Sequence, residues 1–138
     1  MDTVAVTKTV ECVSAVDVEN SLEVSHDGEL VYTSRGRWLH PLLDLEDFLA
    51  GSDLPRNKLK LRDKVIGRAA AGLVISLGLG CVHAVLLSEL GADLLASHGV
   101  PYTYEELVPK IACRTEDLTR EMVDPDEIRA LVRALASK

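Results

Sequence analysis

The chain has 138 residues, enough for one domain with a substantial hydrophobic core. Its net charge of −7 and its aromatic content of 4% argue against a surface that binds nucleic acid or an anionic membrane. A hydrophobic content of 47% excludes general disorder, so we expect a globular protein with neither nucleic acid nor a membrane as partner.

The N-terminal stretch is ambiguous. Its valines alternate as in a strand, but several also fall at helical spacing, so both structures stay open for residues 2–17. No secretion signal or lipidation motif is visible, and a cytoplasmic protein is expected. Cys12, Cys81 and Cys113 are widely spaced without a Cys-x-x-Cys pair, which predicts neither a disulfide framework nor a zinc ribbon.

The first strong signal is a β-hairpin. Residues 21–25 and 29–34 are short alternating apolar runs, and Asp27-Gly28 lies between them. An Asp-Gly dipeptide in that position is a strong hairpin signature because both residues tolerate the positive φ angles of a tight turn. We therefore expect two antiparallel strands here.

A basic loop follows the hairpin and contains the single tryptophan. Arg35, Arg37 and Trp38 have two interpretations: they cover a ligand, or they form a solvated loop anchored by the tryptophan. Pro41 then opens a short apolar helix that Gly51 ends.

Residues 62–77 are predicted to form the central buried helix. Charged side chains occur only in its first turns, and beyond Arg68 there is none before Glu89, so most of the helix is expected to be buried. Asp63 stands where a carboxylate would cap the free N–H groups of the helix start. The apolar positions at helical spacing are Val65, Ile66, Ala69, Ala70, Leu73 and Leu77.

The uncharged run has a second interpretation as a membrane span. Residues 69–88 are long enough to cross a bilayer. However, Gly78 and Gly80 interrupt them, and glycines after a helix are typical of a helix end followed by a turn. A helix, a glycine turn and a buried strand over residues 81–87 are therefore the favoured interpretation.

A strand–helix–strand unit follows. Ser88 is a suitable N-cap for a helix that ends at Gly99, and residues 100–104 have the pattern of a second strand. The order predicts two parallel strands with a right-handed crossover. Residues 107–111 are predicted to be a turn or a short helical segment.

The chain closes with an amphipathic helix over residues 124–138. Asp124-Pro125 followed by two acids is a strong helix start, and the apolar stripe behind it predicts docking on the rest of the domain. Residues 1–138 are therefore interpreted as a single α/β domain with a mixed sheet.

Several of these stretches together resemble a small uncharacterised prokaryotic family, known only as a domain of unknown function and grouped by structure with the cytidine-deaminase-like fold. The resemblance covers about residues 21–114. It implies a three-layer α-β-α arrangement and a helix within residues 1–20. The stretches that carry it are Asp27-Gly28, Asp63-Lys64-Val65-Ile66-Gly67-Arg68-Ala69-Ala70-Ala71, Ser88-Glu89, His98-Gly99 and Leu107-Val108-Pro109.

The zinc chemistry of deaminases is not predicted. A zinc deaminase needs His-x-Glu or Cys-x-Glu at one helix start and Pro-Cys-x-x-Cys at the next. The expected helix starts read Asp63-Lys64-Val65 and Ser88-Glu89-Leu90, and neither supplies such ligands. The prediction is a deaminase-like domain without metal or other cofactor.

The two expected helix starts nevertheless predict a binding site for an anionic group, because helix N-termini present free N–H groups. The alternative is that Asp63 and Ser88 are plain caps and that Lys64 and Arg68 are solvated. The candidate ligand-binding residues are Asp63, Lys64, Gly67, Arg68, Ser88 and Glu89.

Two residues are candidates for catalysis. Cys113 precedes Arg114, whose positive charge would favour a thiolate, and Glu89 lies at a predicted helix start. The alternative for Cys113 is a half-buried structural thiol, and no histidine pairs with it at a recognisable spacing.

Two functional hypotheses follow. The first is a metal-independent binder, or enzyme, that acts on a nucleotide or another phosphorylated small molecule. The second is a non-enzymatic interaction module that forms a homodimer. The sequence identifies neither the ligand nor a reaction.

Overall fold

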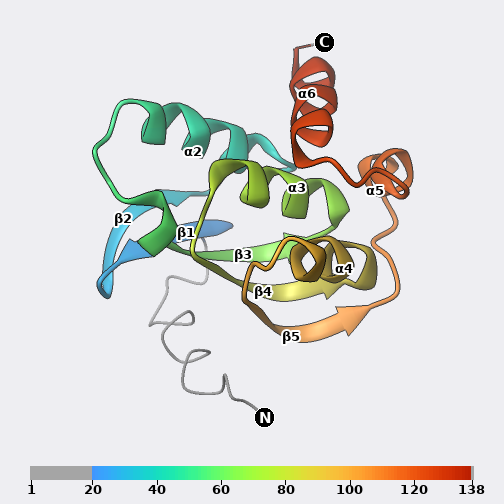
Figure 1. Cartoon of the computed structure of the whole chain (residues 1–138), viewed down its shortest axis with the longest axis horizontal. Helices are drawn as coiled ribbons and strands as arrows, with labels where there is room; N and C mark the ends of the chain where they lie inside the picture. The colour runs from blue at the N-terminus through green and yellow to red at the C-terminus, as the bar shows by residue number, and fades with distance from the viewer. Residues whose placement is uncertain (1–19, 138) are drawn as a thin grey trace.

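The computed structural model describes residues 20–137, and its strands form one mixed sheet in the order β2-β1-β3-β4-β5 (Figure 1). β1 pairs antiparallel with both β2 and β3, while β3, β4 and β5 are parallel. The ambiguous N-terminal stretch lies outside the described residues. The strands are β1 Leu22–His26, β2 Glu29–Ser34, β3 Lys60–Ile66, β4 Cys81–Ser88 and β5 Tyr102–Val108.

The helices α2, α3 and α4 lie side by side over one face of this sheet (Figure 1). α3 is central, since it packs against α2, α4, α5 and α6. The α/β class and the mixed sheet are therefore confirmed, while the three-layer arrangement stays a prediction. The helical elements are α2 His40–Ala50, η1 Arg56–Lys58, α3 Arg68–Leu77, α4 Glu89–Ser97, α5 Arg114–Thr119 and α6 Pro125–Ala136.

The expected start of the central helix was wrong. Lys60–Ile66 is strand β3, and the helix begins only at Arg68, with Gly67 in the N-cap position. Asp63 is therefore a strand residue, paired with Leu22 of β1 and Ala84 of β4, and caps no helix. The structure thus contains one strand more than the sequence predicted.

A polar row across the sheet explains why β3 was not recognised. Glu23, Arg62 and His83 are neighbours on β1, β3 and β4, and all three are buried. His83 is satisfied on both ring nitrogens, by the Thr103 hydroxyl at 2.7 Å and the Glu105 carboxylate at 3.1 Å. Charged residues at buried strand positions hide the apolar alternation on which strand prediction depends.

Most other elements agree with the sequence. The hairpin turns at Asp27 and Gly28, which have φ angles of 54° and 82°. Gly78 ends α3 in a left-handed conformation, and the Ser88 hydroxyl accepts a hydrogen bond from the N–H of Gly91 as a true N-cap. β4, α4 and β5 form the predicted parallel unit.

Two expectations need adjustment. β5 continues to Val108, so Leu107 and Val108 belong to a strand rather than to a turn or a helical segment. No helix in residues 20–137 is long and apolar enough to cross a membrane, because glycines and strand β4 break the uncharged run.

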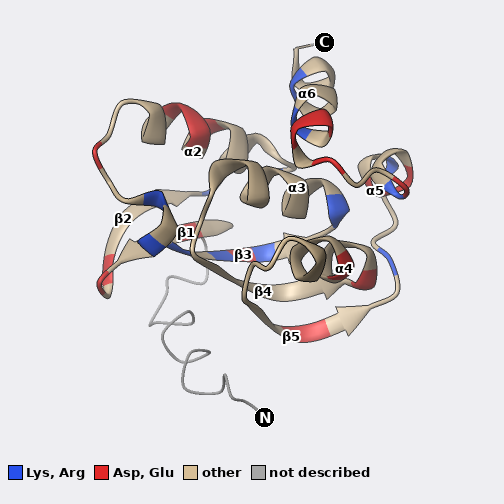
Figure 2. Cartoon of the chain, in the orientation of Figure 1, with Lys and Arg blue, Asp and Glu red and all other residues tan. Residues whose placement is uncertain are grey.

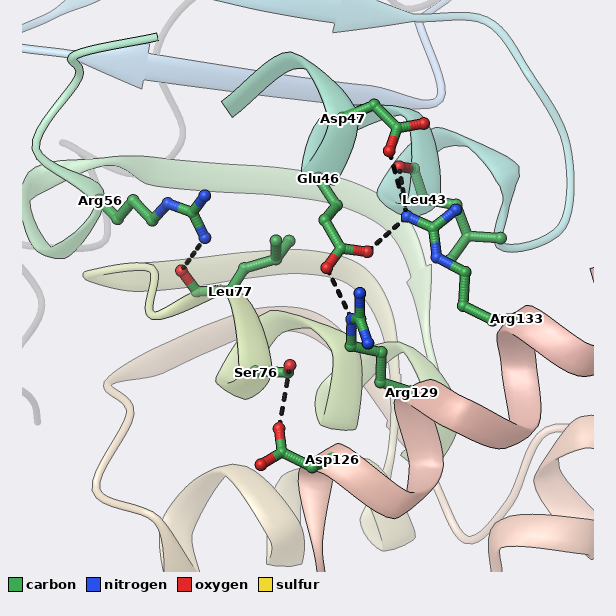
Figure 3. A network of polar contacts seen from close by, with 9 residues as sticks. All are labelled: Leu43, Glu46, Asp47, Arg56, Ser76, Leu77, Asp126, Arg129 and Arg133. Atoms are coloured by element: carbon green, nitrogen blue, oxygen red, sulfur yellow. Dashed lines mark hydrogen bonds and ion pairs between the residues drawn. The ribbon is translucent and has the colours of Figure 1, made fainter. Parts of the chain in front are cut away.

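The C-terminal helix α6 docks as predicted, and its closest approach is to α3. A Cβ atom on Gly72 would lie 2.7 Å from Cγ2 of Ile128, which is fully buried, so only glycine lets the two helices approach this closely. Figure 3 shows the polar contacts of α6. The Ser76 hydroxyl of α3 donates a hydrogen bond to Asp126, and Glu46 of α2 faces α6.

Charge complementarity fixes α6 against α2 (Figure 2). The Glu46 carboxylate accepts hydrogen bonds from Arg129, at 2.6 Å, and from Arg133. Burial alone would raise the pKa of Glu46, but the hydrogen bonds and charges of the two arginines outweigh it and lower that pKa. Asp47 also contacts Arg133, at 3.3 Å, but it is far more exposed.

Replacing Glu46 by glutamine is expected to reduce the free energy of unfolding by about 1 kcal/mol at pH 7. Because the pKa of Glu46 is lowered in the folded chain, its contribution is present above about pH 4.3 and is lost as the pH falls further. Urea unfolding of wild type and E46Q at several pH values measures this difference. D47N is the matched control, with a loss below about 0.5 kcal/mol. Equal losses in the two variants would contradict the assignment.

Candidate functional site

A cavity of about 380 Å³ lies at the carboxyl end of β3, on the helix-bearing side of the sheet. Three segments build most of its walls, and Ser21 adds to them. They are the loop before α2 with the start of that helix, the end of β3 with the start of α3, and the segment after β5 with the start of α5. The lining residues are Ser21, Gly36, Arg37, Trp38, Leu39, Pro41, Asp63, Lys64, Val65, Gly67, Ala69, Ala70, Ile111, Cys113, Thr115 and Glu116.

The Glu116 carboxylate joins two of these segments. Its Oε1 accepts a hydrogen bond from the N–H of Arg68 at 2.7 Å, and its Oε2 accepts one from the N–H of Ile111 at 3.0 Å. Glu116 is 1% exposed, so it is a buried carboxylate at the N-terminus of α3. A Cβ on Gly67 would come within 2.8 Å of its Oε1, so a larger residue there would displace the carboxylate from the N–H of Arg68.

Asp63 supplies a second carboxyl group to the cavity wall. Burial raises its pKa to about 7, although hydrogen bonds from the N–H groups of Val65 and Lys64 and the nearby Arg62 favour the ionised form. Near neutral pH this group is therefore present in both states. It can donate a hydrogen bond when protonated and accept hydrogen bonds in either state.

Two cationic residues and one aromatic residue also line the cavity. Arg37 and Lys64 both line it and are both exposed to solvent. Trp38 also lines it, and this residue has a φ angle of 59°, in the left-handed region that non-glycine residues seldom adopt. Cys113 is an exposed free thiol here, 3.4 Å from the hydroxyl of Thr115.

The structure brings three of the six predicted ligand-binding residues together in the cavity, and they are Asp63, Lys64 and Gly67. Arg68 points elsewhere: its guanidinium donates to the backbone oxygens of Leu90 and Met122 and so connects α3 to α4 and to the segment before α6.

Ser88 and Glu89 also lie outside the cavity lining. The Ser88 hydroxyl is fully buried as the cap of α4, and Glu89 is exposed. The N-terminus of α4 faces protein rather than open space, because a Cβ on Gly91 would lie 2.8 Å from the backbone oxygen of Gly67. Of the two catalytic candidates, Cys113 lines the cavity and Glu89 does not.

The observed helix starts can be compared with the zinc-ligand pattern of deaminases. α2 follows Leu39 and begins with His40-Pro41, and α3 begins with Arg68 after Gly67, so neither start supplies the ligand pattern of a zinc deaminase. Within residues 20–137, no group of three His, Cys, Asp or Glu side chains is arranged to hold a metal ion.

Glu116 is the residue of this site that sequence analysis did not identify. It lies 48 positions after Arg68, and no local pattern links the two. A weak signal existed, because Glu116 falls in the first turn of a short helix where acids are common. Arg37 and Trp38 had been considered as a ligand cover, and the structure places both in the cavity wall.

Comparison with known proteins gives a family without an assigned activity. The model of a family described as "Domain of unknown function (DUF1893)", also called TM1506, matches residues 16–135. The chain is similar to the crystal structure of the DUF1893 family protein TM1506 from Thermotoga maritima, with 25% identity and a TM-score of 0.76. The similarity covers 85% of this chain and 81% of that protein. No curated protein matches the chain.

Replacing Asp63 by asparagine is expected to stabilise the protein at alkaline pH. Because the pKa of Asp63 is raised in the folded chain, ionising it costs stability as the pH rises from about 4 to about 7, and the full cost persists above that range. The upper bound is about 4 kcal/mol, from about 1.36 kcal/mol per pH unit.

Denaturant unfolding from pH 5 to pH 9 measures this effect as the difference between D63N and wild type. The exposed Asp53, replaced by asparagine, controls for the loss of one carboxylate. A D63N difference that does not grow with pH would show that Asp63 is already ionised at pH 5.

Proposed function

We propose that this chain, which belongs to the DUF1893 family of domains of unknown function, binds a nucleotide or another phosphorylated small molecule in the cavity at the carboxyl end of β3. One observation carries the proposal: Asp63, Arg37 and Lys64 come from two separate segments and line the same cavity. A carboxyl group and two cations in one concave site can orient a ligand that has a polar ring and an anionic group.

The position of the cavity supports the proposal. In open α/β sheets, ligands bind beyond the carboxyl ends of strands where the strand order changes direction. Here the antiparallel β1 meets the parallel strands at β3, and the cavity lies at the end of that strand. Its volume of about 380 Å³ falls within the range of small-molecule sites.

The anionic group of the ligand would meet side chains rather than the N-termini of α3 and α4. The N-terminus of α3 is occupied by the Glu116 carboxylate, and the Ser88 hydroxyl caps α4. A phosphate placed at either would compete with a group that the protein already supplies. Arg37 and Lys64 are exposed and line the cavity, so they are the groups we assign to phosphate.

We also propose that the fold is cytidine-deaminase-like without the zinc site. The support is topological: an antiparallel hairpin comes first, and three parallel strands joined by helices follow in the order β2-β1-β3-β4-β5. The described helix starts supply no zinc ligands, so the proposed function keeps the pocket of such a fold and derives no step from metal chemistry.

The second hypothesis, a homodimeric interaction module, stays a prediction. Its natural surface is the edge strand β5, where Tyr104 is 44% exposed and Leu107 is 39% exposed. An exposed edge can pair with another chain, but Glu105 and Glu106 lie between Tyr104 and Leu107, and charged residues protect edges against pairing.

The proposal predicts that AMP, CMP, GMP or UMP raises the melting temperature in a concentration-dependent way. R37A and K64A should each weaken nucleotide binding about five- to tenfold, because each removes one charge-assisted contact to phosphate, while the affinity for the matching nucleoside stays unchanged. Titration calorimetry measures both affinities.

K58A is the control, since Lys58 is an exposed lysine of η1 outside the cavity lining. The proposal is wrong if none of the four nucleotides, ribose 5-phosphate or inorganic phosphate shifts the melting temperature. It is equally wrong if R37A and K64A bind nucleotides like wild type.

A further inference from the structure

We infer that the ligand of this cavity carries a flat aromatic ring that stacks on Trp38, so that Trp38 is the residue that selects heterocyclic ligands over other phosphorylated molecules. The inference rests on the proposed function and adds the chemical class of the ligand. It is carried by the place of Trp38 in the cavity wall, its backbone conformation and the shape of the remaining wall.

The backbone of Trp38 is held in an unfavourable conformation. Its φ angle of 59° lies in the left-handed region, which is unfavourable for a residue with a large side chain. Such residues persist where the surrounding structure imposes them, and they are concentrated at ligand sites. Here the next residue, Leu39, is buried and precedes α2, so the loop is fixed on that side and turns Trp38 toward the cavity.

Trp38, the single tryptophan of the chain, is not buried in the hydrophobic core. The residue is 44% exposed. The His40 ring packs against it at an interplanar angle of 70°, with ring centroids 5.1 Å apart. Because such a T-shaped contact covers at most one face of the indole, aromatic surface is left for a ligand to stack on.

The rest of the wall suits a thin, flat group. Gly67, Ala69 and Ala70 line the cavity with no side chain larger than a methyl group. Asp63 lines the same cavity, and its carboxyl can hydrogen-bond the edge of a ring that has nitrogen or amino groups. A sugar phosphate, which has no aromatic ring, would leave both Trp38 and the small-residue wall unused.

Trp38 also provides the measurement, because intrinsic tryptophan fluorescence reports on this one residue. AMP and adenosine are expected to quench the fluorescence with saturation, and ribose 5-phosphate and inorganic phosphate are not. Calorimetry should show that W38L weakens AMP binding about tenfold or more, and that W38F, which keeps a ring, stays within about threefold of wild type. CMP, GMP and UMP are measured in parallel.

F48L is the matched control, because Phe48 is an exposed aromatic residue that stacks on Tyr32 outside the cavity lining. It should bind AMP like wild type, and circular dichroism establishes that each variant is folded. If W38L binds every nucleotide with wild-type affinity, or ribose 5-phosphate binds as tightly as AMP, the inference is wrong while the proposed function stands. If no compound shifts the melting temperature of wild type, the proposed function is wrong and the inference with it.

Discussion

The buried Glu116 carboxylate at the N-terminus of α3 is the interaction on which the candidate site depends. A carboxylate there satisfies a free N–H group and opposes the positive end of the helix dipole. Because its other oxygen accepts from Ile111, the same side chain holds the segment after β5 against the turn after β3. Two of the three walls of the cavity are thereby fixed by one residue.

This arrangement has a chemical consequence for the ligand. The anion that the N-terminus of α3 would attract is already present in the protein, so under the proposed function the negative charge of the ligand would meet the exposed cations Arg37 and Lys64. Asp63 lines the same cavity, and its raised pKa of about 7 allows it to act as a hydrogen-bond donor or acceptor at neutral pH. The cavity thus combines apolar wall residues, a titratable carboxyl group and two cationic residues.

The sequence predicted those elements whose signals are local. The Asp27-Gly28 hairpin, the Ser88 cap and the start of α6 at Asp124-Pro125 each depend on a few neighbouring residues, and all are present. The boundary between β3 and α3 was missed because the strand carries charges at buried positions and merges into helical spacing without a turn signal other than Gly67.

In the candidate site, too, contacts between residues far apart in the sequence were not predicted. A carboxylate was expected to cap the central helix, and one does, but it is Glu116, far away in the chain, and not Asp63. Asp63 and Lys64 line the cavity from a strand end instead of a helix start, while Gly67 lines it as the N-cap residue of α3. Arg68 was expected to bind ligand, yet its guanidinium donates hydrogen bonds to two backbone oxygens. Only the tertiary structure defines where these oxygens lie. Residue types near the site were predictable, and their partners were not.

We propose that three segments distant in sequence form one ligand site. A titration of the isotopically labelled protein with AMP, followed through its backbone amide resonances, tests this. We expect joint movement of the resonances of residues 36–39, 63–70 and 111–116, with one dissociation constant. Resonances of the polar row at Glu23 and His83 should stay in place. Movement confined to the β5 edge, or movement of one segment without the other two, would contradict the proposal.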